Sequence, residues 1–324
     1  MSKRALIVAV LVTAGVGALL LWGLLDAKEG SDQRIRIGYL PIAPDASFFV
    51  ALERGFFEDQ GLLIEPVKFA TSNQVLEALV SERIDATAIV ALEAALALEA
   101  NAPGEFRIVE MTAATEGTRV HRIVVKNDSD IKELADLRGK HVGTFPGSQM
   151  VVFLKLVLER YFDPESELRI TQLKPPLQPQ ALQSGQVDAV FCLEPMGTLL
   201  EMRGIGRAIS VNPLYEHIQK PFPTAVSVVS ARLAKSAPET VAAIVRALDA
   251  AHDFMRSEPD RAREALVKYS PIDIEIAAEV GLYDYWGLSE IERAAVQQLA
   301  DLFFEKGVLA RRVSVDQLYL SDGK

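Results

Sequence analysis

The stretch IGYLP, residues 37–41, is echoed 105 residues later by VGTFP, residues 142–146. Each copy is followed, 14 or 15 residues after its glycine, by Leu-Glu-Arg, at residues 52–54 and 158–160. A recurrence of spacing within one chain indicates a recurrence of architecture. The two copies therefore predict two structural units built on one plan.

A second pair of segments repeats in the same order. EALVSERIDA, residues 77–86, aligns with QALQSGQVDA, residues 180–189, and five of the ten positions are identical. The offset between these segments is close to that of the first pair. Two matches in register strengthen the prediction of two similar lobes.

The residues around these landmarks predict alternating strands and helices. Short β-branched runs bounded by Gly or Pro are typical of strands, and longer runs with apolar residues at helical spacing are typical of helices. The predicted elements fall at residues 34–39, 48–57, 64–69, 73–81 and 86–90 in the first copy, and at 141–144, 150–161, 169–173, 179–184 and 188–191 in the second. Such alternation predicts two doubly wound α/β lobes with parallel sheets and helices on both faces.

Two passages connect the predicted lobes. MTAATEGTRVHR, residues 111–122, lies between the copies, and KPFP, residues 220–223, follows the second copy. Two crossings predict a two-segment hinge. The predicted boundaries give lobe 1 residues 31–115 plus 225–324 and lobe 2 residues 116–224. Helical spacing predicts a C-terminal helical set in lobe 1, at residues 238–255, 261–269, 272–286 and 290–304.

Residues 1–30 read as an export signal or a membrane anchor. Lys3 and Arg4 precede an uncharged, 21-residue apolar run over residues 5–25. A helix of that length spans a bilayer core of about 30 Å, and the end of the run is a poor signal-peptidase site. We expect an uncleaved hydrophobic helix that tethers the chain to the inner membrane and places the rest of it on the periplasmic side. A cleaved signal peptide is the alternative.

The composition excludes several classes of protein. The 324 residues carry a formal charge of −10 without a basic block, which argues against a nucleic-acid partner. Cys192 is the single cysteine and the four histidines lie far apart, so the sequence offers no disulfide and no metal-ligand spacing. Motifs of serine hydrolases, phosphate-binding loops and zinc proteases are missing. We expect no catalytic residue, no cofactor and no metal.

Four stretches resemble a known family. They are RIGYLPIAPDASFFVALERGFFEDQGL (36–62), SERIDATAI (81–89), IVVKNDSDIKELADLRGKHVGTFPGS (123–148) and QVDAVFCLEPMG (186–197). Over about residues 34–270 the chain resembles the nitrate-, sulfonate-, taurine- and thiamine-precursor-binding group of ABC-transporter solute-binding proteins. The resemblance implies a type II periplasmic-binding-protein fold, capture of a small solute between two lobes, and delivery to a membrane permease that a separate ATPase drives.

The chain also departs from this group. Many relatives carry a tryptophan before the Glu-Pro dipeptide, where this chain has Leu193. Related eukaryotic proteins act as pyrimidine synthases through a cysteine-rich motif, where this chain offers Cys192 alone. The resemblance therefore implies a binding protein rather than an enzyme.

Ligands of doubly wound sheets gather beyond the carboxyl ends of the strands, where helix N-termini present N–H groups. Residues in the loops at these strand ends are therefore candidates for solute binding. The predicted ligand-binding set is Tyr39, Asp45, Ser47, Phe48, Ser72, Asn73, Thr115, Gly147, Ser148, Gln149, Phe191 and Glu194.

Structural roles remain open for several of these residues. Asp45 and Ser47 are also candidate helix caps, and Phe191, like Phe145, is a candidate core residue. Glu194 could pair with a nearby arginine, and Thr115 could lie in a solvated loop.

The charges near the strand ends bear on the solute. An oxyanion site calls for arginine, lysine or many N–H donors. The candidate loops contain acidic residues but no lysine or arginine, and Arg119 and Arg122 beside the hinge are expected on a solvated face. We therefore expect a thiamine-precursor pyrimidine or another heteroaromatic or amine-bearing solute, rather than a sulfonate, taurine or nitrate. A membrane-anchored solute sensor is the second hypothesis, and a pyrimidine-synthase-like enzyme is the third.

Overall fold

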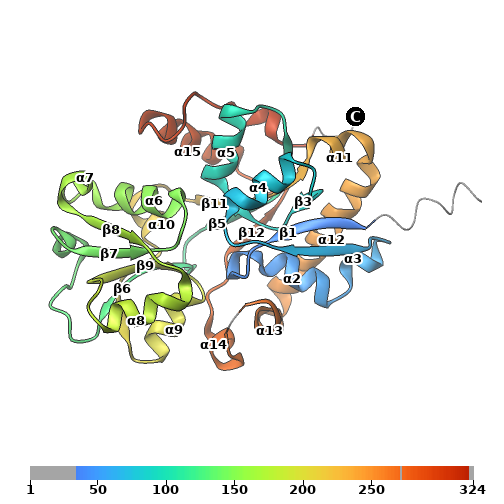
Figure 1. Cartoon of the computed structure of the whole chain (residues 1–324). Coiled ribbons are helices and arrows are strands. Elements are labelled where there is room, and N and C mark those ends of the chain that lie inside the picture. Colours follow the sequence, from blue (N-terminus) through green and yellow to red (C-terminus); the bar gives the residue numbers. More distant parts are fainter. Residues whose placement is uncertain (1–33, 271, 321–324) are drawn as a thin grey trace, which may run out of the picture.

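The computed structural model describes residues 34–270 and 272–320, which form two lobes, each built on its own β-sheet (Figure 1). The predicted hydrophobic helix over residues 5–25 lies outside the described residues. None of the helices in the described part of the chain combines the length and the apolar character needed to cross a bilayer.

The first lobe contains a seven-stranded mixed sheet. Its strands are β1 (Ile35–Tyr39), β2 (Ile64–Lys68), β3 (Ala86–Thr87), β4 (Val90–Ala91), β5 (Phe106–Ala114), β11 (Phe222–Ser230) and β12 (Asp284–Gly287). β1 pairs in parallel with β2 and β3. β11 runs antiparallel to β3, β4 and β5, and β12 extends the edge beyond β5.

The second lobe contains a five-stranded sheet in the order β10-β6-β9-β7-β8. Its strands are β6 (His121–Lys126), β7 (His141–Thr144), β8 (Arg169–Gln172), β9 (Ala189–Leu193) and β10 (Gly206–Val211). β7 pairs in parallel with β8 and β9, whereas β6 runs antiparallel to β9 and β10.

The structure confirms the internal repeat. β1 and β7, which carry the repeated Gly segments, each lie between two parallel neighbours. The repeated aspartates take equivalent positions: Asp85 accepts a hydrogen bond from the Arg36 N–H at 3.0 Å, and Asp188 accepts one from the His141 N–H at 2.7 Å. In both lobes this carboxylate joins the third strand of the repeat to the first.

Helices cover both sheets. They are α2 (Ala46–Glu53), α3 (Phe56–Asp59), α4 (Ser72–Val80), α5 (Leu92–Asn101), α6 (Ser148–Leu158), α7 (Pro164–Glu167), α8 (Gln178–Gln183), α9 (Met196–Met202), α10 (Pro213–His217), α11 (Ala231–Ser236), α12 (Pro238–Ser257), α13 (Pro259–Tyr269), α14 (Ile274–Glu279) and α15 (Arg293–Glu305). Short 3-10 turns lie at Ala43–Asp45, Leu134–Leu137, Pro175–Leu177 and Asp316–Leu318. α12 and α13 belong to the C-terminal set and pack against α2 of the first lobe (Figure 1).

Three sequence predictions of local structure are corrected. The predicted strand over residues 86–90 is two short strands, β3 and β4. The predicted helix over residues 272–286 is the short helix α14 followed by β12, because the sheet edge at β5 provides a backbone partner for that segment. The sheets are mixed rather than parallel, because the long strands next to the two crossings, β5, β6 and β11, run against their neighbours.

The chain passes between the lobes twice, once after β5 and once before β11. β11 begins at Phe222 and belongs to the first sheet over its whole length. The predicted boundary between the lobes, between residues 224 and 225, therefore falls inside this strand. The lobe boundaries themselves stay a prediction. Buried apolar side chains of both lobes form a continuous core, which the crossings connect.

Candidate functional site

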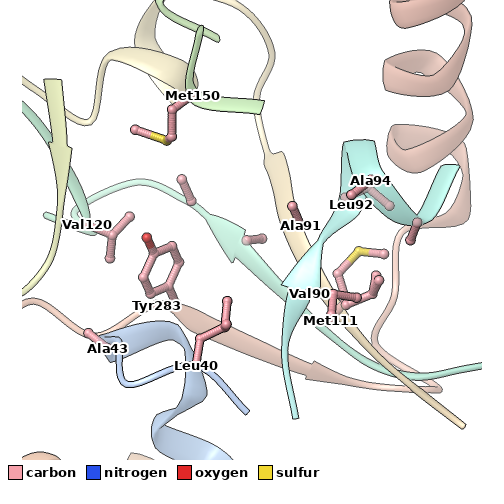
Figure 2. Close-up of a cluster of buried hydrophobic side chains, with 14 of the residues drawn as sticks. Leu40, Ala43, Val90, Ala91, Leu92, Ala94, Met111, Val120, Met150 and Tyr283 are labelled. Carbon is pink, nitrogen blue, oxygen red and sulfur yellow. The ribbon is translucent and has the colours of Figure 1, made fainter. Parts of the chain in front are cut away.

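A small cleft lies between the two lobes, with a volume of about 60 Å³. That space holds a few water molecules. The first lobe lines it with Leu40, Ile42, Pro44, Thr71, Ser72, Asn73, Ile89, Ala91, Glu93, Ala94, Thr224, Ala225 and Tyr283. The second lobe lines it with His121, Phe145, Pro146, Gly147, Ser148, Gln149, Met150 and Leu193. Figure 2 shows Leu40, Met150 and Tyr283 among the buried side chains of this region.

Five of the predicted ligand-binding residues lie together in this cleft. Ser72 and Asn73 begin α4, and the Ser72 hydroxyl accepts a hydrogen bond from the Ala91 N–H at 3.0 Å. Gly147, Ser148 and Gln149 lie at the start of α6 in the opposite lobe. Both groups directly follow the strand ends from which the sequence predicted them.

Two side chains from the start of α6 reach the first lobe. The Ser148 hydroxyl lies 3.2 and 3.1 Å from the two carboxylate oxygens of Glu93. The Gln149 side-chain amide donates to the Thr224 carbonyl oxygen at 2.8 Å. These contacts join the lobes directly across the cleft.

The backbone conformation at position 147 favours glycine. Its φ is +125°, which side chains disfavour, and apart from Gly147 and its two chain neighbours no atom of the described residues lies within 4 Å of where a Cβ would be. No side chain caps the N-terminus of α6, because Gly147 has none and Ser148 donates to Glu93 instead. The first N–H groups of this helix therefore have no side-chain cap, although the Gly147 N–H donates to the Gln172 side chain at 2.8 Å.

The predicted aromatic residues Tyr39, Phe48 and Phe191 lie outside the cleft lining. Tyr39 packs against Phe48 and Phe49, with ring centroids 6.0 and 5.7 Å apart. Phe48 and Phe191 are buried in the core. Side chains alternate between the two faces of a strand, and Tyr39 points to the helix-covered face.

Asp45, Ser47 and Thr115 also lie outside the lining. Asp45 is fully buried, and its carboxylate accepts the Leu40 N–H at 2.7 Å, which holds the loop after β1. Burial raises the pKa of Asp45 well above its usual range. Ser47 is buried, and its hydroxyl has no hydrogen-bond partner among the described residues. Thr115 is in the first crossing and donates to Asp284 at 3.0 Å.

Glu194 is buried beside Arg122, outside the lining, and the carboxylate lies 2.7 Å from the guanidinium. Burial raises the pKa of Glu194 to about 7 despite this pairing. Arg122 also pairs with Glu201 and donates to Thr198 at 3.1 Å. The expectation of a solvated Arg122 is wrong, because Arg122 is buried and its guanidinium pairs with Glu194 and Glu201.

Five polar residues of the cleft were not in the predicted set: Thr71, Glu93, His121, Thr224 and Tyr283. Glu93 is in the first turn of α5 and is 5% exposed. Burial raises the pKa of Glu93, and it lowers that of His121 to about 3. His121 Nδ1 and the Tyr283 hydroxyl have no hydrogen-bond partner among the described residues. Glu93 follows the end of β4 by two residues, so the rule that ligands gather beyond strand ends could have pointed to it if β4 had been predicted.

A second hollow, of about 550 Å³, lies against the first crossing. Thr115 and Arg119 line it on one side, and Arg256 and Arg263 line it on the other. Tyr283 borders both the hollow and the cleft. Groups of three or more side chains able to hold a metal ion do not occur within residues 34–270 and 272–320.

The sequence matches the model of the NMT1-like family over residues 28–269. The chain belongs to the NMT1-like family. A Bacillus subtilis protein named for binding aliphatic sulfonates is 26% identical over 325 residues, covering 97% of this chain and 93% of that protein. The resemblance to this group of binding proteins is thus confirmed.

Solved structures confirm the fold. The alkanesulfonate-binding protein SsuA of Xanthomonas axonopodis pv. citri, bound to MOPS, superposes with a TM-score of 0.73 at 23% identity, over 88% of this chain and 97% of that one. The periplasmic aliphatic sulphonate binding protein SsuA of Escherichia coli gives 0.73 at 21% identity, over 91% and 95%. The fold of this NMT1-like chain is therefore the predicted periplasmic-binding-protein fold. These relatives are binding proteins and not enzymes.

Proposed function

We propose that this chain is the extracytoplasmic solute-binding component of an ABC importer. The observation that carries the proposal is the cleft, where Ser148 and Gln149 of one lobe contact Glu93 and Thr224 of the other. A solute that touches both lobes stabilises the closed state over the open one, and this differential affinity shifts the population. Membership of the NMT1-like family and the sulfonate-binding relatives support the proposal.

Five residues are proposed to contact the solute: Ser72 and Asn73 from the first lobe and Gly147, Ser148 and Gln149 from the second. Each lines the cleft at a helix start. Free N–H groups at the start of α6 suit a hydrogen-bond acceptor on the solute. The hydroxyl and amide groups can donate or accept.

The proposed solute is a small organic molecule, such as a thiamine-precursor pyrimidine or another heteroaromatic or amine-bearing compound. Lysine and arginine are absent from the cleft lining among the described residues. A sulfonate or nitrate would therefore lack a cationic partner there. This chain is therefore proposed to bind a different class of solute from its sulfonate-binding relatives.

The proposed location is the periplasmic side of the inner membrane, with residues 5–25 as the tether. The solute would pass to a membrane permease that a separate ATPase drives. The apolar run after Lys3 and Arg4 supports this arrangement, and the Escherichia coli structural neighbour is described as periplasmic.

A thermal-shift screen of the full-length chain in detergent tests the proposal. The compounds are thiamine precursors, flavins, alkanesulfonates, nitrate and amino acids. A solute at 100 times its Kd adds about 2.7 kcal/mol of stability, which raises the melting temperature by roughly 5–10 °C. One chemical class should give this shift. Melting temperatures that stay unchanged with every class at millimolar concentration would contradict the proposed function.

A further inference from the structure

The carboxylate of Glu93 is incompletely hydrogen-bonded in the closed cleft. It is 5% exposed, and both of its oxygens lie within 3.2 Å of the Ser148 hydroxyl. A serine hydroxyl carries one proton, whereas a carboxylate offers about four lone-pair positions. Ser148 therefore satisfies one oxygen at a time, and a buried carboxylate with unfilled acceptor positions is unfavourable.

The same carboxylate lacks a cationic partner. Among the described residues that line the cleft, Glu93 is the one with a carboxyl side chain, and none is a lysine or an arginine. The adjacent His121 is neutral there, because burial lowers its pKa to about 3. Arg122 follows His121 in the chain but is held by Glu194 and Glu201.

Two further polar atoms of the cleft wall are also without hydrogen-bond partners among the described residues. His121 Nδ1 and the Tyr283 hydroxyl are buried and make no hydrogen bond within the described residues. The two rings meet edge to face with centroids 5.6 Å apart. The hydroxyl end of Tyr283 is directed toward the side of the cleft where Met150 lies (Figure 2). These neutral groups can orient a bound molecule without adding charge to the site.

We infer that Glu93 selects the charge of the solute: the cleft takes an organic amine whose N–H groups donate to Glu93, and it rejects oxyanions. This inference rests on the proposed function, since it names the chemistry of the solute that the cleft would capture. A protonated amine supplies both the charge and the several N–H donors that the carboxylate lacks. A sulfonate in the same place would meet a like charge in a buried site.

Burial also raises the pKa of Glu93, which is consistent with a carboxyl group that has no lysine or arginine among the residues lining the cleft. The Ser148 hydroxyl supplies one hydrogen bond to this carboxylate, and the amine would fill the remaining acceptor positions. If the hydrogen bond between Glu93 and Ser148 had only a structural role, the protein would show no preference for the charge of a ligand. Ligand charge therefore separates the two roles.

Titration calorimetry of the full-length chain at pH 7.5 tests this inference. The probes are benzylamine and butylamine, their N-acetyl derivatives, and benzenesulfonate and butanesulfonate. The variant is Glu93→Gln, which keeps the shape and removes the charge. The matched control is Glu99→Gln, on the same helix, where the carboxylate accepts the Gly104 N–H and does not line the cleft.

The amines should bind the parent protein, and their N-acetyl derivatives and the sulfonates should not. Glu93→Gln should weaken amine binding at least about 30-fold, as expected when one partner of a buried charged pair is removed. Glu99→Gln should stay within about twofold of the parent. If Glu93→Gln does not fold, Glu93→Asp replaces it and should weaken amine binding while keeping the preference for amines over sulfonates.

Binding of the sulfonates in preference to the amines would overturn the role of Glu93 and leave the proposed importer function in place. Equal amine affinity of the parent and Glu93→Gln would do the same. If none of these probes binds and the broader thermal-shift screen is also negative, the proposed function itself fails, and the inference fails with it.

Discussion

The Ser148 hydroxyl of the second lobe lies 3.1 Å from a carboxylate oxygen of Glu93 in the first lobe. The two residues come from the first turns of α6 and α5, which belong to different lobes. This contact and the Gln149 contact to Thr224 both join the two lobes. Ser148, Gln149 and Glu93 therefore link the lobes through polar groups that a solute can also use.

Ser148→Ala should weaken solute binding about 3- to 10-fold, because it removes one hydrogen bond of the closed state. The melting temperature without solute should change little, since Ser148 is not part of the apolar core. Calorimetry with the solute found in the screen measures the effect. Ser166→Ala, on the exposed surface of the second lobe, is the control. Equal affinities for Ser148→Ala and the parent would remove Ser148 from the site.

Asp188→Ala should lower the free energy of unfolding by about 1–3 kcal/mol, because the His141 N–H loses its acceptor. Asp85→Ala should cost more, since Asp85 also pairs with Arg36 and Arg232. Urea unfolding at pH 7 measures both changes. Asp188→Asn keeps an acceptor oxygen and should retain most of the stability. No loss in either alanine variant would show that the repeated aspartate has no structural role.

Arg122→Met should destabilise the second lobe by about 3–5 kcal/mol, because it leaves the buried Glu194 facing no cation. The double variant Arg122→Met with Glu194→Gln should recover part of this loss. Arg203→Met breaks an exposed pair with Asp273 and should cost less than about 1 kcal/mol. Chemical denaturation at pH 7.5 compares the three. A stable Arg122→Met protein with reduced solute binding would instead place Arg122 in the ligand site.

His121 should contribute a loss of stability as the pH is lowered below 6.5, opposite in sign to the contribution of Glu194, whose pKa is raised in the folded state. The pKa of His121 is about 3 in the folded state against 6.5 for an ordinary histidine, so the unfolded chain binds more protons between these values. Between pH 6.5 and 5 this contributes about 2 kcal/mol. Urea unfolding of the parent and of His121→Gln at several pH values measures it. His121→Gln should lose less stability on acidification than the parent. If the free energy of unfolding depends on pH in the same way in both proteins, the low pKa of His121 is contradicted.

Many strands and helices of the repeat could be predicted from the sequence, because the spacing of apolar residues that indicates them is local in the chain. His141–Thr144 was predicted with the bounds that the structure shows, and α4 begins one residue from its predicted start. The segment over residues 272–286 was mispredicted because β12 forms only against β5, a partner far away in the sequence. Strand pairing of this kind depends on tertiary contacts that periodicity does not contain.

The cleft was predictable only in part, for a similar reason. Ser72 and Gly147 follow strand ends directly, so topology alone brings them to the cleft. Glu93 lies within an apolar run whose helix was not predicted, and Tyr283 enters from the C-terminal segment. Tyr39 lies next to a strand end but faces the helices, which the sequence does not reveal without the orientation of the strand.

Distance changes between the lobes test the central claim most directly. Fluorophores attached to Asn101→Cys in the first lobe and Ser166→Cys in the second report on closure, while the native Cys192 is buried. Energy transfer should rise on addition of the solute identified in the screen, and it should rise less in the Ser148→Ala background. Tight binding of that solute with no change in energy transfer would contradict capture by lobe closure.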